Sequence, residues 1–227
     1  DFYPVVPFND ATDTLAALDL SKHNKEFSEE IYQSCKTLGD YIEEKKAAAN
    51  ATYLVGGYGE VREMYRRSSL FDKNLQSEFE GIEEPRSLHL GIDVWGPAGT
   101  KVYAPLGGMV HRLACNNMDG DYGATIILQH QIDMFNFYTL YGHLALKDLG
   151  TIRSGQFITR GENFAHFGNP AENGNWPPHL HFQLITDMRN YEGDFPGVCK
   201  LSEAQHYLSI CPNPDFILNM MKHKLHS

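Results

Sequence analysis

Histidines at short spacings from one another, or from an aspartate, are the residues of this chain that could do metal chemistry. The first group is His89-Leu90-Gly91-Ile92-Asp93. On a straight β-strand, positions four apart share a face but lie about 13 Å apart, too far to bind one ion. His89 and Asp93 therefore become joint ligands only if the strand bends, which Gly91 permits. Taken alone, this group favours a simpler interpretation, an exposed His and Asp on a strand edge.

The second group is His179-Leu180-His181-Phe182, which follows Pro177-Pro178. Residues two apart on a strand share a face, so the two histidines point together while Leu180 and Phe182 face the core. Such a pair is a good half of a metal site, although by itself it is only moderately specific.

The third group ends a predicted strand at Tyr141-Gly142-His143. Strand alternation puts Tyr141 on the His143 face, and Gly142 lets another backbone or a ligand approach closely. A turn histidine bonded to the backbone explains this group alone equally well.

Together the three groups are more informative than any one of them. Two histidines and one carboxylate make a three-ligand site with an open fourth position, and two histidines remain for proton transfer or for polarising a carbonyl.

These motifs resemble those of the lysostaphin/LytM-type zinc metallopeptidases, which cut peptidoglycan cross-bridges. The His-x-x-x-Asp motif lies at 89–93 and the His-x-His motif at 179–181. The sequence between the two motifs also resembles that of the family, at Gly99-Thr100, Val102-Tyr103-Ala104-Pro105, Gly107-Gly108-Met109-Val110, Tyr141-Gly142-His143-Leu144 and Gly155-Gln156. The similarity covers roughly 87–187 and points to a less characterised branch with an N-terminal helical extension.

The resemblance implies one Zn²⁺ per chain, with His89, Asp93 and His181 as its ligands and His143 and His179 as catalytic histidines. It implies an antiparallel β-sheet groove of the duplicated hybrid motif type, and an endopeptidase acting on peptidoglycan cross-bridges or a related short peptide. The alternative is a catalytically idle or regulatory metal-binding module of the same fold. In some relatives an upstream segment supplies an inhibitory ligand, and Asn74 is the candidate here.

Three further residues are candidates for substrate binding: Tyr141, Trp176 and Arg86. Tyr141 would line the site on the His143 face, or pack as an ordinary strand tyrosine. Trp176 would wall the groove, or fill a gap against the prolines. Arg86 would pair with an acid or a substrate carboxylate, or remain solvated.

The elements that must position these residues fall into three parts. Residues 1–86 read as an N-terminal helical extension, with helices over 21–50, capped by Ser21, and over about 60–70. Residues 87–190 read as an antiparallel β core, with strands near 87–94, 101–104, 108–115, 123–130, 135–142, 157–167 and 179–185. Residues 191–227 read as a C-terminal extension with short helices. The fold class is mainly β.

The composition limits the classes of partner and the locations that are expected for this protein. The net charge of −10 repels nucleic acid, and no Lys/Arg cluster offsets it. No apolar run is long enough to span a membrane. No signal segment is visible, so a cytoplasmic location is open, while a cell-wall enzyme would work in the cell envelope or periplasm. Cys199 and Cys211 could bridge in an oxidising compartment, but four independent thiols are the simpler prediction.

Two rival functions use similar residues. A phosphotransfer domain would need an exposed histidine but no Asp93, and a cupin-like iron or manganese enzyme would need a Glu and a distant His at other spacings. The His-x-x-x-Asp motif argues against both.

Overall fold

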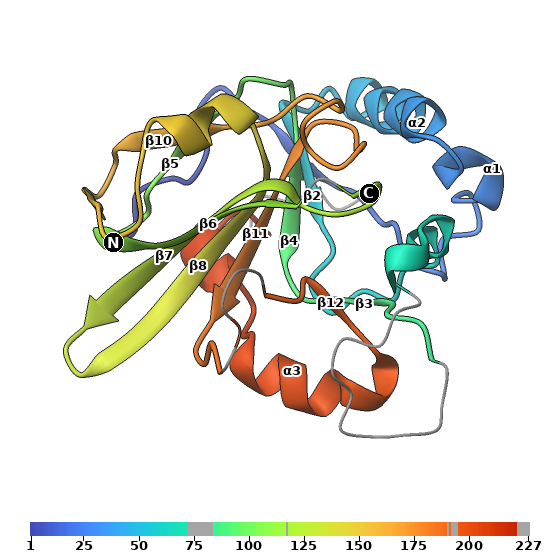
Figure 1. Ribbon diagram of the computed structural model, residues 1–227. Coiled ribbons are helices and arrows are strands. Elements are labelled where there is room, and N and C mark those ends of the chain that lie inside the picture. Colours follow the sequence, from blue (N-terminus) through green and yellow to red (C-terminus); the bar gives the residue numbers. More distant parts are fainter. Residues whose placement is uncertain (72–83, 117, 190, 192–194, 222–227) are drawn as a thin grey trace.

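The core of the molecule is a large sheet, seen in the computed structural model in Figure 1. The structure describes residues 1–71, 84–116, 118–189, 191 and 195–221. Within these, eight strands pair in the order β1 (Leu15–Ala17), β2 (Tyr53–Gly56), β4 (Ile92–Trp95), β11 (His179–Ile185), β8 (Phe135–Leu144), β7 (Gly123–Ile132), β6 (Gly108–Asn116) and β9 (Phe157–Ile158). All neighbours are antiparallel except β1 and β2, which are parallel.

Two short ladders and several helices flank this sheet. β5 (Lys101–Tyr103) pairs with β10 (Asn163–His166), and β3 (Leu88–His89) pairs with β12 (Val198–Cys199). The α-helices are α1 (Glu29–Tyr32), α2 (Cys35–Ala48), α3 (Ala204–Ile210) and α4 (Asp215–Leu218). Single 3₁₀ turns are η1 (Met64–Arg67), η2 (Ser69–Phe71), η3 (Leu146–Gly150) and η4 (Leu201–Glu203). In Figure 1, α1 and α2 lie beyond the β2 side of the sheet and α3 lies below β3 and β12.

Strand alternation separates a core face from a polar face at the centre of the sheet. On β11, Leu180, Phe182 and Leu184 join one buried apolar cluster. They pack there with Ile92 and Val94 of β4. The opposite face of β11 carries His179, His181 and Gln183, all of them buried. A completely buried polar face is costly unless its groups are paired, so its partners must be accounted for.

The predicted fold class is confirmed, since the structure is mainly β with an antiparallel-dominated sheet, N-terminal helices and short C-terminal helices. The predicted strand 87–94 is two strands, because β3 ends at His89 and β4 begins at Ile92. The predicted strand 157–167 is likewise two, β9 and β10, separated by a turn around Gly161 with φ 80°.

The N-terminal part differs most from its prediction. The predicted helix 21–50 is two helices, α1 and α2, and the longer one begins only at Cys35, after the capping box formed by Ser34 and Thr37. Residues after Ser21 form turns instead, in which Asp19 accepts from the Ser21 amide and Asn24 accepts from the Glu26 amide. The predicted helix 60–70 is η1 and η2. Residues 1–86 also contribute β1 and β2, so this part is joined to the sheet; the three domain boundaries stay a prediction.

No helix in the described ranges is both long and apolar enough to cross a membrane.

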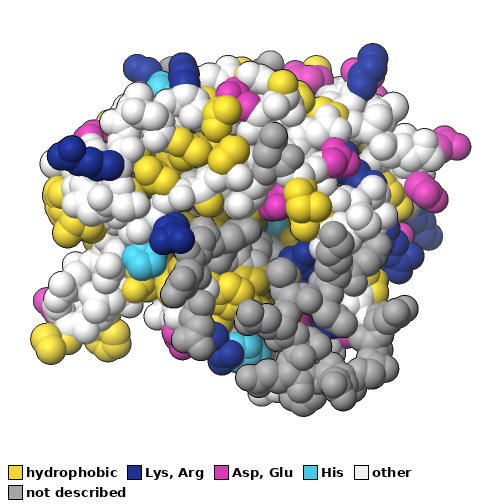
Figure 2. Space-filling view, viewed as in Figure 1, with side chains coloured by type: hydrophobic (Ala, Val, Ile, Leu, Met, Phe, Trp, Pro, Cys, Tyr) yellow, Lys and Arg dark blue, Asp and Glu magenta, His cyan; other side chains and the backbone are white. Residues whose placement is uncertain are grey.

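The end of the β7–β8 hairpin protrudes and carries apolar side chains (Figures 1 and 2), where Met134 and Phe135 are 90% and 79% exposed. All four cysteines are free thiols, with Cys199 and Cys211 buried.

Candidate active site

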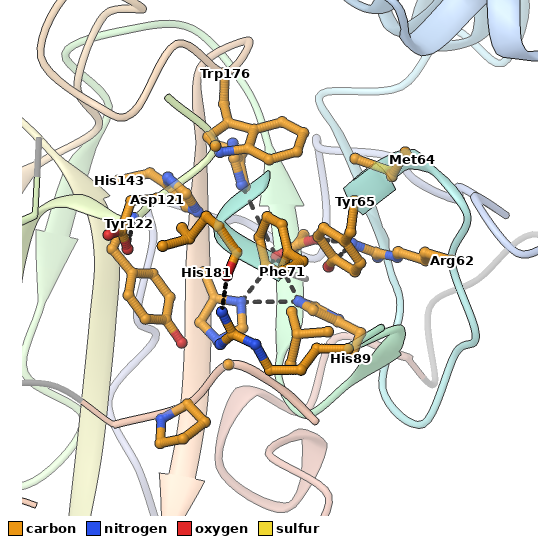
Figure 3. A pocket seen from close by; sticks show the side chains of 18 of the residues that line it. Arg62, Met64, Tyr65, Phe71, His89, Asp121, Tyr122, His143, Trp176 and His181 are labelled. Carbon is orange, nitrogen blue, oxygen red and sulfur yellow. Dashed lines mark hydrogen bonds and ion pairs between the residues drawn. The ribbon is translucent and has the colours of Figure 1, made fainter. Parts of the chain in front are cut away.

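Strand register brings three of the predicted ligands together. Asp93 on β4 lies directly opposite His181 on β11, and β3 adds His89. Asp93 Oδ1 lies 3.3 Å from His181 Nδ1 and 3.4 Å from His89 Nε2, and the two nitrogens are 2.9 Å apart. A tetrahedral zinc ion with bonds of about 2.0–2.2 Å separates its ligand atoms by roughly 3.3 Å. The three atoms therefore have roughly the spacing of three ligands in a tetrahedral zinc site. Figure 3 shows the His89 and His181 rings facing each other in the pocket.

The bend between β3 and β4 makes this possible. A Cβ on Gly91 would lie 2.5 Å from His181 Cε1 and 2.8 Å from the Phe182 carbonyl oxygen. Only glycine lets the backbone pass this close to the imidazole while it turns His89 and Asp93 towards one point. The bend expected at Gly91 is present.

Outer hydrogen bonds fix which nitrogen of each ligand histidine carries the proton. His89 Nδ1 lies 2.9 Å from the Gly57 carbonyl oxygen, which can only accept. His181 Nε2 lies 2.9 Å from Gln183 Oε1, and the Gln183 amide is oriented by donating to the Pro196 carbonyl. Both histidines thus donate outwards and turn lone pairs inwards. Two lone pairs and a carboxylate oxygen that converge in a buried place repel one another unless a cation lies between them, so these residues fit a zinc ion.

The electrostatics of the site follow from burial and from one arginine. Asp93 Oδ2 accepts a 2.6 Å hydrogen bond from Arg62 Nη1, and both side chains are 2% exposed. Burial acts to raise the pKa of Asp93, but the facing His89, Arg62 and the hydrogen bonds hold that pKa well below its usual range. Burial, with Arg62, lowers the pKa of His89 to about 4. At neutral pH the site offers an ionised carboxylate and a neutral His89 imidazole, the forms that bind metal.

Two further histidines lie beside the cluster. His179 Nε2 is 4.0 Å from Asp93 Oδ1, and its ring stacks on Trp95 with centroids 3.9 Å apart. The rings of His143 and His179 have centroids 4.1 Å apart. Burial lowers the pKa of His179 to about 4 and holds that of His143 well below its ordinary value. Each ring donates from Nδ1 to a backbone carbonyl, of Pro177 for His179 and of Asn173 for His143. Each Nε2 therefore keeps a lone pair that can take a proton.

His143 reaches the site by a backbone conformation that strand alternation does not provide. Its φ of 61° is left-handed, and the β7–β8 register shifts nearby, between Ala124 and Ile126. Tyr141, two residues earlier, stays on the core face. There its ring packs on Phe164 and Phe182 and its hydroxyl bonds Thr139. Tyr141 and His143 therefore do not share a face as alternation predicted, and of the two interpretations of Tyr141 the structure has the packed strand tyrosine.

A pocket opens over the group formed by His89, Asp93 and His181. Several aromatic side chains line it, and the two other substrate candidates, Trp176 and Arg86, are among its lining residues. The Arg67 guanidinium lies 3.8 Å from the Trp176 ring centroid, and Arg86 donates to the Leu70 carbonyl. Asn74 lies outside the described residues. Arg62 and Gln183 were not among the predicted site residues. Gln183 carried a signal, since it continues the alternation of His179 and His181, whereas Arg62 carried none.

A His-Asp-His group that could hold a metal ion at the base of a pocket, with two additional histidines beside it, is an arrangement that suits metal-dependent hydrolysis. Residues 87–192 match the model of Peptidase family M23, so this part of the chain is similar to that family. Over 124 residues the chain is 33% identical to an uncharacterized metalloprotease of Haemophilus influenzae, covering 55% of this chain and 23% of that relative.

Among solved structures, the chain is similar to the catalytic domain of the antimicrobial peptidase lysostaphin from Staphylococcus simulans. The identity is 19% and the TM-score 0.43, over 80% of this chain and 97% of that one. A zinc containing peptidase from Vibrio cholerae matches with 25% identity and a TM-score of 0.37, over 54% of this chain and 35% of that one.

Proposed function

We propose that this protein is a zinc-dependent metallopeptidase that cleaves a peptide bond by metal-activated water, with peptidoglycan cross-bridges or a related short peptide as substrate. The observation that carries the proposal is the convergence of His89, Asp93 and His181 beside the pair His143 and His179. Three protein ligands would leave a fourth position open, which a closed structural zinc site does not have, and two proton-accepting groups lie beside it. The peptide substrate is supported by the match of residues 87–192 to a peptidase family.

The chain's own residues have separate tasks in this mechanism. His89, Asp93 and His181 would hold the ion. Zinc bound in this way would polarise the scissile carbonyl and lower the pKa of an attacking water molecule. His143 and His179 would divide two roles: one, neutral, accepts the proton of the attacking water at Nε2, and the other stabilises the developing oxyanion, for which its Nε2 must first carry a proton. The aromatic walls around Trp176 would exclude bulk water and so strengthen these interactions.

The test is metal analysis of the purified protein, combined with cleavage assays on peptidoglycan and on glycine-rich and D-Ala-containing peptides. The expected result is about one Zn²⁺ per chain and chelator-sensitive cleavage. Zinc bound without cleavage of any of these substrates would instead support the idle or regulatory module. Protein that binds no zinc would contradict the proposal altogether.

Two alanine variants separate the predicted roles. His181→Ala removes a ligand and is expected to abolish zinc binding and turnover together. His179→Ala removes a group that lies beside the cluster, so it is expected to keep zinc and to lose turnover by about 10²–10⁴-fold, the usual contribution of an acid–base group. A His179→Ala protein that no longer binds zinc would contradict this division.

A further inference from the structure

The loop 57–62 runs alongside the first ligand-bearing strand and is held to it by backbone hydrogen bonds. The Gly59 amide donates to the His89 carbonyl and the His89 amide donates to the Glu60 carbonyl, each at 2.9 Å. The Arg62 amide donates to the Ser87 carbonyl, also at 2.9 Å. This loop lies before residue 87, where the match to the peptidase family begins. Its position beside His89 is therefore a feature of this chain's own N-terminal part.

Side-chain and carbonyl groups of the same loop reach two of the three proposed ligands. The Gly57 carbonyl accepts from His89 Nδ1, and Arg62 donates to Asp93. Gly57 has a φ of 109°, and a Cβ there would lie 2.0 Å from Arg62 Nη2 and 2.9 Å from His89 Nδ1. A glycine is thus required where the guanidinium, the imidazole and the loop backbone meet.

The Arg62 guanidinium is itself held from two sides. Its Nε donates to Glu60 Oε2 at 2.6 Å, its Nη1 donates to Asp93 Oδ2 at 2.6 Å, and Tyr65 Oη lies 3.2 Å from Nη1. The two oxygens of Asp93 consequently face different partners. Oδ2 is engaged by the arginine, and Oδ1 faces His89 and His181. This arrangement fixes the carboxylate so that a single oxygen is offered to the metal.

A buried group of ion pairs such as Glu60, Arg62 and Asp93 is weak evidence for a role in stability, because taking the charges out of water is costly and apolar residues in place of the whole group often stabilise a core as well or better. The loss of Arg62 is therefore expected to act mainly through Asp93, the group that it orients. We propose that loop 57–62 is the outer coordination sphere of the metal centre, and that Arg62 is the positioning residue that presents Asp93 Oδ1 as a ligand. The inference rests on the proposed zinc centre.

The test compares Arg62→Met with Arg67→Met in the full chain. Methionine keeps much of the buried apolar volume of Arg62 and removes the guanidinium. Zinc affinity is measured by equilibrium competition with a chromophoric chelator, and folding of the metal-free protein by circular dichroism. Arg62→Met is expected to weaken the zinc Kd by about 10–100-fold, the usual effect of losing an outer partner of a ligand. Arg67, which lies over Trp176 and bonds the Asn175 carbonyl, is the matched control and is expected to change Kd by less than about twofold.

A spectroscopic readout separates positioning from a general structural effect. With Co²⁺ in place of zinc, the visible absorption bands report ligand geometry. Arg62→Met is expected to shift these bands, whereas Arg67→Met is expected to leave them unchanged. A folded Arg62→Met protein with the wild-type Kd and the wild-type Co²⁺ spectrum would overturn the assignment.

Arg62→Lys covers the case in which Arg62→Met does not fold. Lysine keeps the charge but has one ammonium group to serve both Glu60 and Asp93, so a roughly tenfold weaker zinc Kd is expected. A lysine variant with the wild-type Kd and Co²⁺ spectrum would likewise overturn the role of Arg62. Wild-type protein that binds no zinc would overturn the proposed function instead, so the two failures are distinguishable.

Discussion

Strand β11 and the segment 88–95 both carry proposed ligands, but they position them differently. On β11, His179 and His181 share a face by ordinary alternation, and their orientation needs only a regular strand. In the segment 88–95, the strand is broken between His89 and Ile92, and His89 and Asp93 meet only because of that break. The bent segment also depends on Gly57 and Arg62, which lie outside it. A metal half-site on a regular strand is therefore specified locally, and a bent half-site requires support from elsewhere in the chain.

The largest expected effect tests the bend. Gly91→Ala places a Cβ 2.5 Å from His181 Cε1 and 2.8 Å from the Phe182 carbonyl, so the bent segment and β11 must move apart. We expect zinc Kd to weaken by at least about 100-fold in equilibrium chelator competition. Gly150→Ala is the control, because a Cβ there meets nothing within 4 Å. Wild-type zinc affinity in Gly91→Ala would show that the bend does not constrain the site.

The next effect concerns pH and involves a histidine from each region. Burial lowers the pKa of His89 and of His179 to about 4, from an ordinary value of 6.5. The unfolded chain takes up these protons near pH 6.5 and the folded chain only near pH 4, so the unfolded state binds more protons between these values. The stability of the metal-free protein is therefore complete above pH 6.5 and falls as the pH drops towards 4, by on the order of a few kcal/mol.

Urea unfolding of chelator-treated protein at pH 7 and pH 4.5 measures this loss. His179→Asn is expected to reduce the pH dependence of stability, because it removes the contribution of His179 on β11 and leaves that of His89 in the bent segment. Equal free energies of unfolding at the two pH values in the wild-type protein would contradict the burial of neutral histidines.

The smallest expected effect tests the regular half-site. Gln183→Leu removes the acceptor of His181 Nε2 and frees the ring to adopt the other tautomer. Zinc Kd is expected to weaken by about tenfold, less than for Gly91→Ala, because the strand still aims the ring. Gln131→Leu, at an exposed position near the end of β7, serves as the control. If Gln183→Leu weakens the zinc Kd as much as Gly91→Ala does, the orientation of His181 depends on outside support as much as the bent segment does.

Much of this architecture could be predicted because it follows local rules. The pairing of His179 with His181 is a consequence of strand alternation, and Gly91 marks the bend. The contribution of Arg62 could not be predicted, since it depends on the loop 57–62 lying against residues 87–89, and no local pattern encodes that contact. That Tyr141 and His143 face opposite ways could not be predicted for a related reason. The left-handed conformation of His143 reverses its face, and histidine carries no strong signal for such a conformation.

The place of β4 and β11 within the sheet has a consequence for how long an ion would be retained. Each is bonded to a strand on both sides, while the two ends of the sheet are the three-residue β1 and the two-residue β9. Fraying begins at such ends and costs little, whereas the middle opens only when much of the sheet does. Amides of β4 and β11 should thus be among the slowest to exchange with deuterium, and escape of a bound ion would be tied to rare, cooperative opening.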